Sequence, residues 1–248
     1  MTDKLPNNKD SLHIKKEESW KMFNSIAPTY NALNSILSAG ILNYWRSKLV
    51  SKIPNIKNLS LLDCATGTGE VMFSIMKKRA NDIKQIIGLD LAQEMMNKGS
   101  KVCEKLQYES QMSFVHASAT NIPYEDNSFD CVSMAFGIRN VDDPQKCLHE
   151  IARVLKPNGI TLIMECSLPP NRIIRWIYLI YFRHILPLIG GLISGDYKAY
   201  KYLNKTVETF PSGNNFIALM NNAGLESNFE TLTFGITTLY IGKKTNDK

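Results

Sequence analysis

Cysteine is scarce in this sequence and never occurs as a C-x-x-C pair. Five cysteines lie mostly inside apolar runs, at positions 64, 103, 131, 147 and 166. Structural zinc sites and disulfide frameworks both need cysteines or histidines at short, regular spacing. The pattern therefore predicts buried free thiols in a reducing cytoplasm and no metal site.

A secretory signal, an internal repeat and a low-complexity tract are also absent. Residues 1–19 are polar and charged, without the apolar core of a signal peptide, and are predicted to form a disordered tail. The net charge is +6 and the pI about 9.0, yet no five basic residues are consecutive. Scattered lysines favour a solvated basic surface over a nucleic-acid groove, although the charge also suits an anionic membrane surface.

A single membrane span is not expected from the sequence. The apolar runs 173–182 and 185–193 are interrupted by Arg172, Arg175, Arg183 and His184. Each charge deep in lipid would cost about 2.5–3.5 kcal/mol. Pro187 and the pair Gly190-Gly191 are expected to break a helix. We interpret 167–210 as an insertion that faces a membrane surface or a lipid substrate, while a buried helix covering a sheet is the alternative.

The sequence as a whole predicts one α/β domain over residues 1–248. Strand-like and helix-like periods alternate, which is typical of a doubly wound, mostly parallel sheet. Strands are expected at 60–65, 85–90, 113–117, 130–136 and 160–166, and helices near 70–80, 93–107, 144–156 and 213–223. Segments 227–233 and 236–242 would form a hairpin at the sheet edge, and two helices within 18–50 would pack over the first strand.

Residues 61–70 contain an apolar strand and a Gly-x-Gly turn, and a second apolar run ends at Asp90. This βαβ pattern is typical of nucleoside binding. A dinucleotide fingerprint has a third glycine where this chain has Met72, so room for a pyrophosphate is reduced. The pattern favours S-adenosylmethionine (SAM), which has ribose hydroxyls and no phosphate, over a nicotinamide dinucleotide. A ligand-free tight turn, with Asp90 capping the next helix, is the alternative.

Ligands of such sheets bind at the carboxyl ends of the strands. Ser118 and Ala119 follow the third strand, where adenine would lie. Arg139 and Asn140 follow the fourth strand, beside the expected position of the methyl group. A guanidinium there would align an acceptor and stabilise a phenolate, unless Arg139 only pairs with one of the two aspartates that follow it. His184, in the insertion, is a candidate contact for a substrate hydroxyl.

Several blocks resemble the C-methyltransferases of menaquinone and ubiquinone biosynthesis. They are residues 23–31, 65–69, 135–140, 153–157, 186–190 and 193–203, and the likeness extends from about residue 20 to 242. The resemblance implies SAM-dependent C-methylation of a polyprenylated demethylmenaquinol, with the methoxy-benzoquinol of ubiquinone biosynthesis as the alternative. It also implies a cytoplasmic protein that meets its lipid substrate at the inner surface of the membrane.

The resemblance implies roles for particular residues. Cofactor contacts fall on Thr68, Asp90, Ser118 and Ala119, with Gly67, Gly69 and Asp63 from the same strand and turn. Arg139 and Asn140 would be catalytic, and His184 and Tyr200 would face the substrate. Three positions depart from the usual family residues: Ser118 replaces Asp or Asn, Glu70 replaces Asp, and Ala135 replaces a Ser of some relatives.

Three other functions remain open at this stage. A nicotinamide reductase would need the phosphate space that Met72 restricts. A non-catalytic SAM-fold assembly module would keep the cofactor pocket without turnover. An RNA methyltransferase is disfavoured by the scattered lysines and the apolar insertion. Whether the chain forms a homo-oligomer is not indicated by the sequence.

Overall fold

Seven strands pair side by side in the order β3-β2-β1-β4-β5-β7-β6. The structure is a computed structural model that describes residues 18–38, 40–194 and 197–245, apart from the side chains of 36, 37, 194, 198–201 and 203. The strands are β1 (Leu59–Cys64), β2 (Ile83–Asp90), β3 (Met112–His116), β4 (Phe129–Ala135), β5 (Leu155–Cys166), β6 (Leu225–Leu232) and β7 (Thr237–Lys244). The first five are parallel, and β7 runs antiparallel to both β5 and β6.

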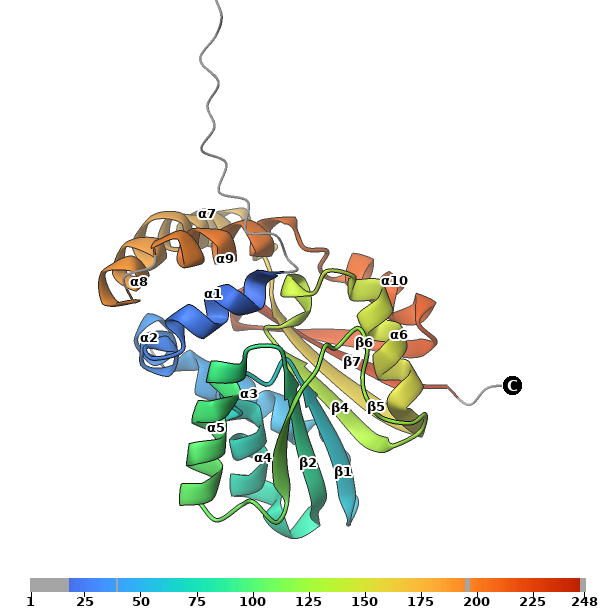
Figure 1. Cartoon of the computed structure of the whole chain (residues 1–248). Helices are drawn as coiled ribbons and strands as arrows, with labels where there is room; N and C mark the ends of the chain where they lie inside the picture. The colour runs from blue at the N-terminus through green and yellow to red at the C-terminus, as the bar shows by residue number, and fades with distance from the viewer. Residues whose placement is uncertain (1–17, 39, 195–196, 246–248) are drawn as a thin grey trace, which may run out of the picture.

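Helices occupy both faces of the sheet and one of its ends. They are α1 (Ser19–Ile26), α2 (Tyr30–Leu37), α3 (Ile41–Ser51), α4 (Glu70–Arg79), α5 (Gln93–Lys105), α6 (Pro144–Val154), α7 (Arg172–Ile180), α8 (Leu186–Ser194), α9 (Tyr197–Thr209) and α10 (Asn214–Asn222). Short turns are η2 (Ala80–Asp82), η3 (Ile138–Asn140), the π-helical η4 (Tyr181–Ile185) and η5 (Thr233–Gly235). Helices α3, α4 and α5 lie on one face, and α6 and α10 lie on the other (Figure 1).

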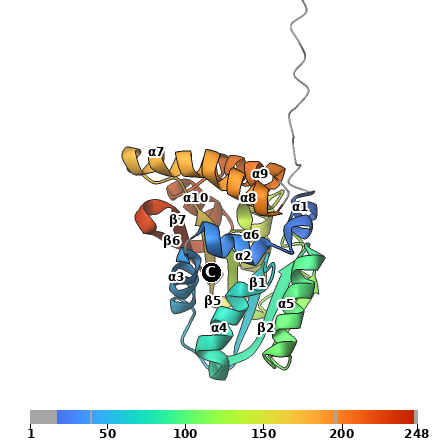
Figure 2. The same ribbon diagram turned by 90° about the vertical axis from the view of Figure 1, so that its left-hand side faces the viewer.

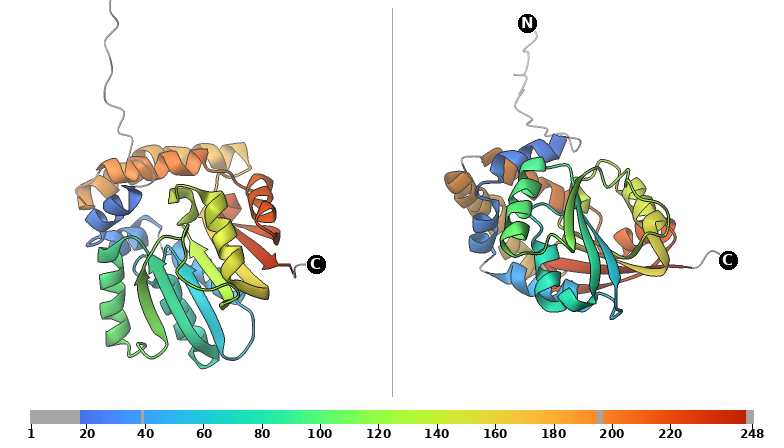
Figure 3. Two further views of the ribbon diagram at one scale, coloured as in Figure 1. Left: turned by 45° about the vertical axis from the view of Figure 1, so that its right-hand side comes forward. Right: turned by 60° about the horizontal axis from the view of Figure 1, so that its bottom comes forward.

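The two faces are separated by the period-two alternation of the strands. Leu61 and Ile86 belong to the core under α3, α4 and α5, whereas their neighbours Leu62 and Ile87 belong to the core under α6 and α10. Parallel strands are buried on both faces, so they read as continuous apolar runs. The predicted doubly wound sheet and its edge hairpin are confirmed, and the hairpin is seen at the edge of the molecule in Figure 3.

Two predicted boundaries were displaced at the start of β5. Helix α6 ends at Val154, and β5 begins at once with Leu155 instead of residue 160. The Pro157-Asn158 segment therefore lies within the strand, where Asn158 takes a positive φ of 65° and the register to β4 shifts. The Pro-Asn-Gly sequence, which predicted a turn, instead forms an irregularity within the strand, because the residues on either side of it still pair with β4.

Residues 18–50 contain three helices, not the predicted two. Gly40, with φ of 79°, separates α2 from α3, so that α3 packs on the sheet while α1 and α2 lie over its end. Met22, Ile26 and Leu33 form a small core with Met95 of α5. Figure 2 shows α1 and α2 between the strand ends and the layer of α7, α8 and α9.

The expected helix break in the insertion was wrong. Helices α7 and α8 are joined through η4 into one continuous helical segment from Arg172 to Ser194. The π turn lies just before Pro187, where a wider turn accommodates a ring that would collide with a regular α-helical carbonyl. Gly191 serves close packing, since a Cβ there would be 3.1 Å from that of Tyr197 in α9.

One described helical segment, residues 172–193, is long and apolar enough to cross a membrane by length and composition. It lies across the end of the sheet with α9 packed beside it (Figures 1 and 2). Its Tyr178 and Phe182 are buried against Val207 of α9. This arrangement holds the segment against the protein along one face.

Candidate active site

The glycine turn follows β1 at the end of the sheet beneath α2. Gly67 and Gly69 have φ of 56° and 79°, and Gly69 is the residue before the first turn of α4. These left-handed conformations are readily adopted only by glycine. The backbone N–H of Thr66 donates to the carbonyl of Leu89, which ties the turn to β2.

Asp90 ends β2 and accepts two backbone hydrogen bonds. The Gly67 N–H donates to one carboxylate oxygen at 2.7 Å and the Ala92 N–H to the other at 2.8 Å. Burial raises the pKa of Asp90 against the lowering effect of these bonds. Asp90 therefore binds the glycine turn through one oxygen and an amide at the start of α5 through the other. A role in capping α5 does not prevent it from lying beside the glycine turn.

Asp63 is the most enclosed carboxyl group near this turn, with 1% of its surface exposed. The hydroxyls of Thr66 and Ser133 donate to it at 2.7 and 2.5 Å. Burial raises the pKa of Asp63 to about 6, although both hydroxyl bonds oppose the shift. Its hydrogen bonds make it a brace between β1, the turn and β4.

A first cavity of about 130 Å³ lies at the ends of β2, β3 and β4 under α1. Four candidate cofactor residues, Gly67, Asp90, Ser118 and Ala119, line it together with Asn140. The side-chain carbonyl oxygen of Asn140 is buried there without a hydrogen-bond partner among the described residues. Buried polar atoms are normally satisfied, so this oxygen is an acceptor that the described residues leave unused.

A second cavity of about 480 Å³ adjoins the first. Its walls come from α2, α3, η4 and the ends of β1, β4 and β5, and apolar and aromatic side chains predominate, including Trp45, Phe136, Tyr178 and Phe182. The two cavities have five lining residues in common: Tyr30, Ala65, Gly67, Ala135 and Phe136. A ligand in one cavity is therefore next to a ligand in the other.

Arg139 and Asn140 divide between the cavities. Arg139 lines the larger one and Asn140 the smaller one, from the short turn η3 after β4. The predicted alternative, pairing of Arg139 with a following aspartate, was wrong: its ion pair is with Glu165 of β5. Asp143 instead caps α6 by accepting from the Lys146 N–H. Arg139 and Asp143 are close in sequence but have different partners, because the chain turns at η3 between β4 and α6.

Thr68 and Ser118 are held by other polar side chains. The Thr68 hydroxyl donates to the Asn31 side-chain oxygen at 2.9 Å, and Asn31 donates to Glu70, which also pairs with Arg46. These contacts join α2 and α3 to the glycine turn. Ser118 forms a hydroxyl pair with Thr120 at 2.8 Å.

The other candidates do not share one cavity. Thr68 and Asp63 line the larger cavity, Gly67 lines both, and Gly69 lines neither because the ring of Phe114 lies against it. His184 also lines neither. Its side chain is exposed, because the helical segment turns its Tyr178–Phe182 face inward and His184 away. Tyr200 is in α9, but its side chain is outside the described residues.

Sequence reasoning missed Glu165, Tyr30 and Asn31. Glu165 is 2% exposed and pairs with Arg139. One signal was available, since a carboxylate inside the apolar run 160–166 must find a buried partner. Tyr30 and Asn31 come from a separate helix, and no local pattern shows that α2 packs over the turn.

Comparisons with known proteins agree with this geometry. Residues 11–244 match the family described as the ubiE/COQ5 methyltransferase family. The chain is 41% identical to a "Ubiquinone/menaquinone biosynthesis C-methyltransferase UbiE" of Geotalea daltonii, covering 94% of this chain and 99% of that protein. It is 37% identical to a "Demethylmenaquinone methyltransferase" of Bacteroides fragilis, covering 93% and 94%. In fold it resembles a SAM dependent methyltransferase from Aquifex aeolicus, with a TM-score of 0.59, 18% identity, and coverage of 81% and 89%.

Proposed function

The chain belongs to the ubiE/COQ5 methyltransferase family, and we propose that it methylates a ring carbon of a polyprenylated demethylmenaquinol. It is a SAM-dependent C-methyltransferase of quinone biosynthesis. The observation that supports the proposed acceptor is the pair of adjoining cavities with a common wall, a smaller one of mixed polar and apolar lining and a larger, more strongly apolar one. The benzoquinol of ubiquinone biosynthesis is the second candidate, because the Geotalea relative is named for both quinones.

The smaller cavity suits SAM by its donor and acceptor groups. Asp90 offers a carboxylate to ribose hydroxyls, and Asn140 lines the same cavity. At Gly67, a Cβ would meet no atom within 4 Å, so the backbone borders open space. When bound, SAM supplies a methyl group on a sulfonium, and the neutral thioether that remains after transfer is a good leaving group. We assign Asp90, Ser118, Ala119 and Asn140 to this site.

The larger cavity suits the quinol ring. Aromatic side chains form part of its wall, and Arg139 is the buried cation among its lining residues. A guanidinium beside the ring oxygen would stabilise the phenolate that makes the neighbouring carbon electron-rich. Because Arg139 Nη1 also donates to the carbonyl of Phe136 in the common wall, its charge lies close to the place where the cavities meet.

The acceptor is tested with the purified protein and two soluble analogues that carry short prenyl tails, a demethylnaphthoquinol and a methoxy-benzoquinol. Transfer of labelled methyl from SAM to the naphthoquinol, at higher kcat/KM than to the benzoquinol, is expected. The reverse order would replace the first acceptor by the second. Tight SAM binding with no transfer to either ring would favour a non-catalytic module. R139A should lower kcat about 100-fold or more while SAM still binds.

The helical segment Arg172–Ser194 also supports attachment to the inner surface of the membrane. Its solvent side carries exposed apolar side chains, among them Ile173, Trp176, Ile177, Leu188 and Leu192, which are 57–78% exposed. Residues 172–194 include three arginines and no carboxylate; Arg183 pairs with Glu208 of α9, so Arg172 and Arg175 are the arginines that would meet anionic headgroups. The opposite side of the same segment lines the acceptor cavity through Tyr178, Tyr181, Phe182 and Leu186. A polyprenyl tail would thus pass from bilayer to cavity along one helical wall.

Vesicle flotation tests this attachment. The wild type should float with vesicles that contain anionic phosphatidylglycerol and less with neutral vesicles. W176S/I177S should reduce binding at least 10-fold, because each large apolar side chain contributes about 1.5–3 kcal/mol when buried. V102S/L106S is the matched control, since Val102 and Leu106 are 42% and 47% exposed near the end of α5, away from this surface. Equal loss in both variants would contradict the proposal.

A further inference from the structure

Glu165 is a buried carboxylate that the proposed function does not use. It is the penultimate residue of β5 and follows the fully buried Leu162, Ile163 and Met164. A carboxylate in such surroundings is stable only when it is paired and hydrogen-bonded. The hydrogen-bond partners of Glu165 therefore indicate its role.

Those partners belong chiefly to Arg139. One Glu165 oxygen pairs with Nη1 of Arg139 and accepts from the Cys166 N–H at 2.8 Å. The other oxygen lies 3.4 Å from the backbone N of Arg139, which donates to it. Glu165 thus contacts both the main chain and the side chain of Arg139, and it joins the turn η3 to the end of β5.

Within the described part of the chain, Nη1 is the one nitrogen of the Arg139 guanidinium that has hydrogen-bond partners. Nη1 donates to Glu165 and to the carbonyl of Phe136, whereas the buried Nε has no partner among the described residues. Burial lowers the pKa of Arg139, but the Glu165 charge more than offsets this and the pKa is raised. The side chain stays charged while it lines the larger cavity.

We propose that Glu165 is a positioning residue that orients Arg139 toward the acceptor ring. Nη1 is its anchor, and Nη2, for which the described residues show no hydrogen-bond partner, is left for the ring oxygen. The inference rests on the proposed function, because it assigns Glu165 to the step in which Arg139 stabilises the phenolate. A fixed cation needs no reorganisation as charge develops, which is the benefit of a preorganised site.

The test compares E165Q with a variant of a similar ion pair elsewhere. Glu150 and Arg153 form a carboxylate–guanidinium pair on α6 that lines neither cavity, so E150Q controls for the general loss of an ion pair. We expect E165Q to lower kcat at least 10-fold, with the dissociation constant of SAM changed less than 2-fold. E150Q should keep kcat within 2-fold of the wild type, even if it lowers the melting temperature as much as E165Q does.

A second measurement asks whether Glu165 acts through Arg139. Adding E165Q to R139Q should lower kcat less than 2-fold further, because the side chain that Glu165 orients is already gone. An undiminished 10-fold loss in that background would overturn the inference. So would an E165Q variant with the kcat of the wild type.

Two further outcomes separate this inference from the proposed function. If E165Q does not fold, E165D retains the charge but withdraws it by one methylene, and kcat should fall at least 5-fold with SAM binding retained. Wild-type kcat in E165D would then overturn the inference. Methyl transfer by the wild type with none of these losses overturns the positioning role alone, whereas no transfer to any quinol overturns both.

Discussion

Asp63 is a carboxyl group whose burial makes folding depend on pH. Its pKa is raised to about 6 in the folded protein by burial, above the usual value near 4 in an unfolded chain. The folded state therefore binds this proton more tightly than the unfolded state does. The resulting stability is fully present below pH 4 and is lost as pH rises through 6.

We expect D63N to remove that loss, because the amide cannot ionise and still bonds the two hydroxyls. Between pH 4 and 7 the Asp63 contribution changes by up to about 3 kcal/mol, from about two pKa units. Urea denaturation of the wild type and D63N at pH 4.5, 5.5 and 7 measures the difference. A constant gap between the two proteins across these pH values would contradict the prediction.

At the scale of residues, the sequence predicted side chains that stand at strand ends. Asp90 is the last residue of β2, Ser118 and Ala119 lie just beyond the end of β3, and all three line one cavity. The strand boundaries were therefore enough to predict that these residues lie together. The pairing of Arg139 with Glu165 depends on how η3 turns back toward β5 across 26 residues of chain. No local pattern encodes that turn, and a nearby aspartate was the natural but wrong partner.

Strand β2 passes close beneath the glycine turn, and Gly88 is the point of contact. A Cβ on Gly88 would lie 2.6 Å from the sulfur of Met72 and 2.8 Å from Cγ2 of Thr66. Both neighbours are buried. The absence of a side chain in β2 is what lets the turn sit on the strand.

G88A should therefore displace Thr66 and with it the turn that borders the cofactor cavity. We expect a loss of stability of about 1–3 kcal/mol and at least 10-fold weaker SAM binding in calorimetry. G224A is the control: Gly224 has φ of 81° and lies after α10, so alanine strains the backbone there without touching the cavities. If both variants lost stability while both kept wild-type affinity, the contact at Gly88 would not shape the site.

At the scale of elements, periodicity predicted the strands and the α4, α5 and α6 helices because each buries a regular apolar face. It failed in the insertion, where Pro187 suggested a break. The helix continues because η4 widens the turn before the proline and because α9 packs against α8. Such tertiary support is absent from any local reading of the sequence.

The whole molecule should be stabilised by its cofactor. A ligand at 100 times its dissociation constant adds about 2.7 kcal/mol, which for a chain of this size corresponds to a rise in Tm of about 5–10 °C. Differential scanning fluorimetry with SAM measures it, with D90N expected to reduce the rise and NAD to give none. A rise with NAD and none with SAM would reverse the assignment of the small cavity.

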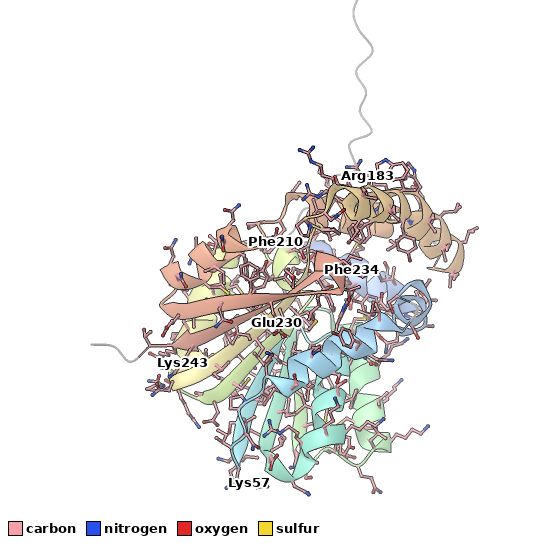
Figure 4. The ribbon with its side chains drawn as sticks, turned by 180° about the vertical axis from the view of Figure 1, so that it is seen from behind. Lys57, Arg183, Phe210, Glu230, Phe234 and Lys243 are labelled. Atoms are coloured by element: carbon pink, nitrogen blue, oxygen red, sulfur yellow. The ribbon has the colours of Figure 1, made fainter. Side chains whose placement is uncertain are left out.

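At the scale of the whole molecule, the sequence predicted the layers of the fold only in part. A doubly wound sheet follows from alternating patterns, but the covering of its end by α1, α2 and the α7–α9 layer depends on contacts between distant segments. In Figure 4, Phe234 lies in the turn of the edge hairpin and Arg183 in the helical layer beside it. The larger cavity opens among these elements, lined by Thr233, Ile236 and Phe182.

The helical segment Arg172–Ser194 has one side toward the cavity and the other toward solvent, and the membrane attachment that we propose for it has a kinetic consequence. An enzyme that draws its substrate through such a wall samples a two-dimensional solution. Its rate should follow the mole fraction of quinol among the lipids, not the amount per litre. Diluting the quinol with inert phospholipid, at constant total quinol, should then slow turnover, the surface-dilution behaviour of interfacial enzymes.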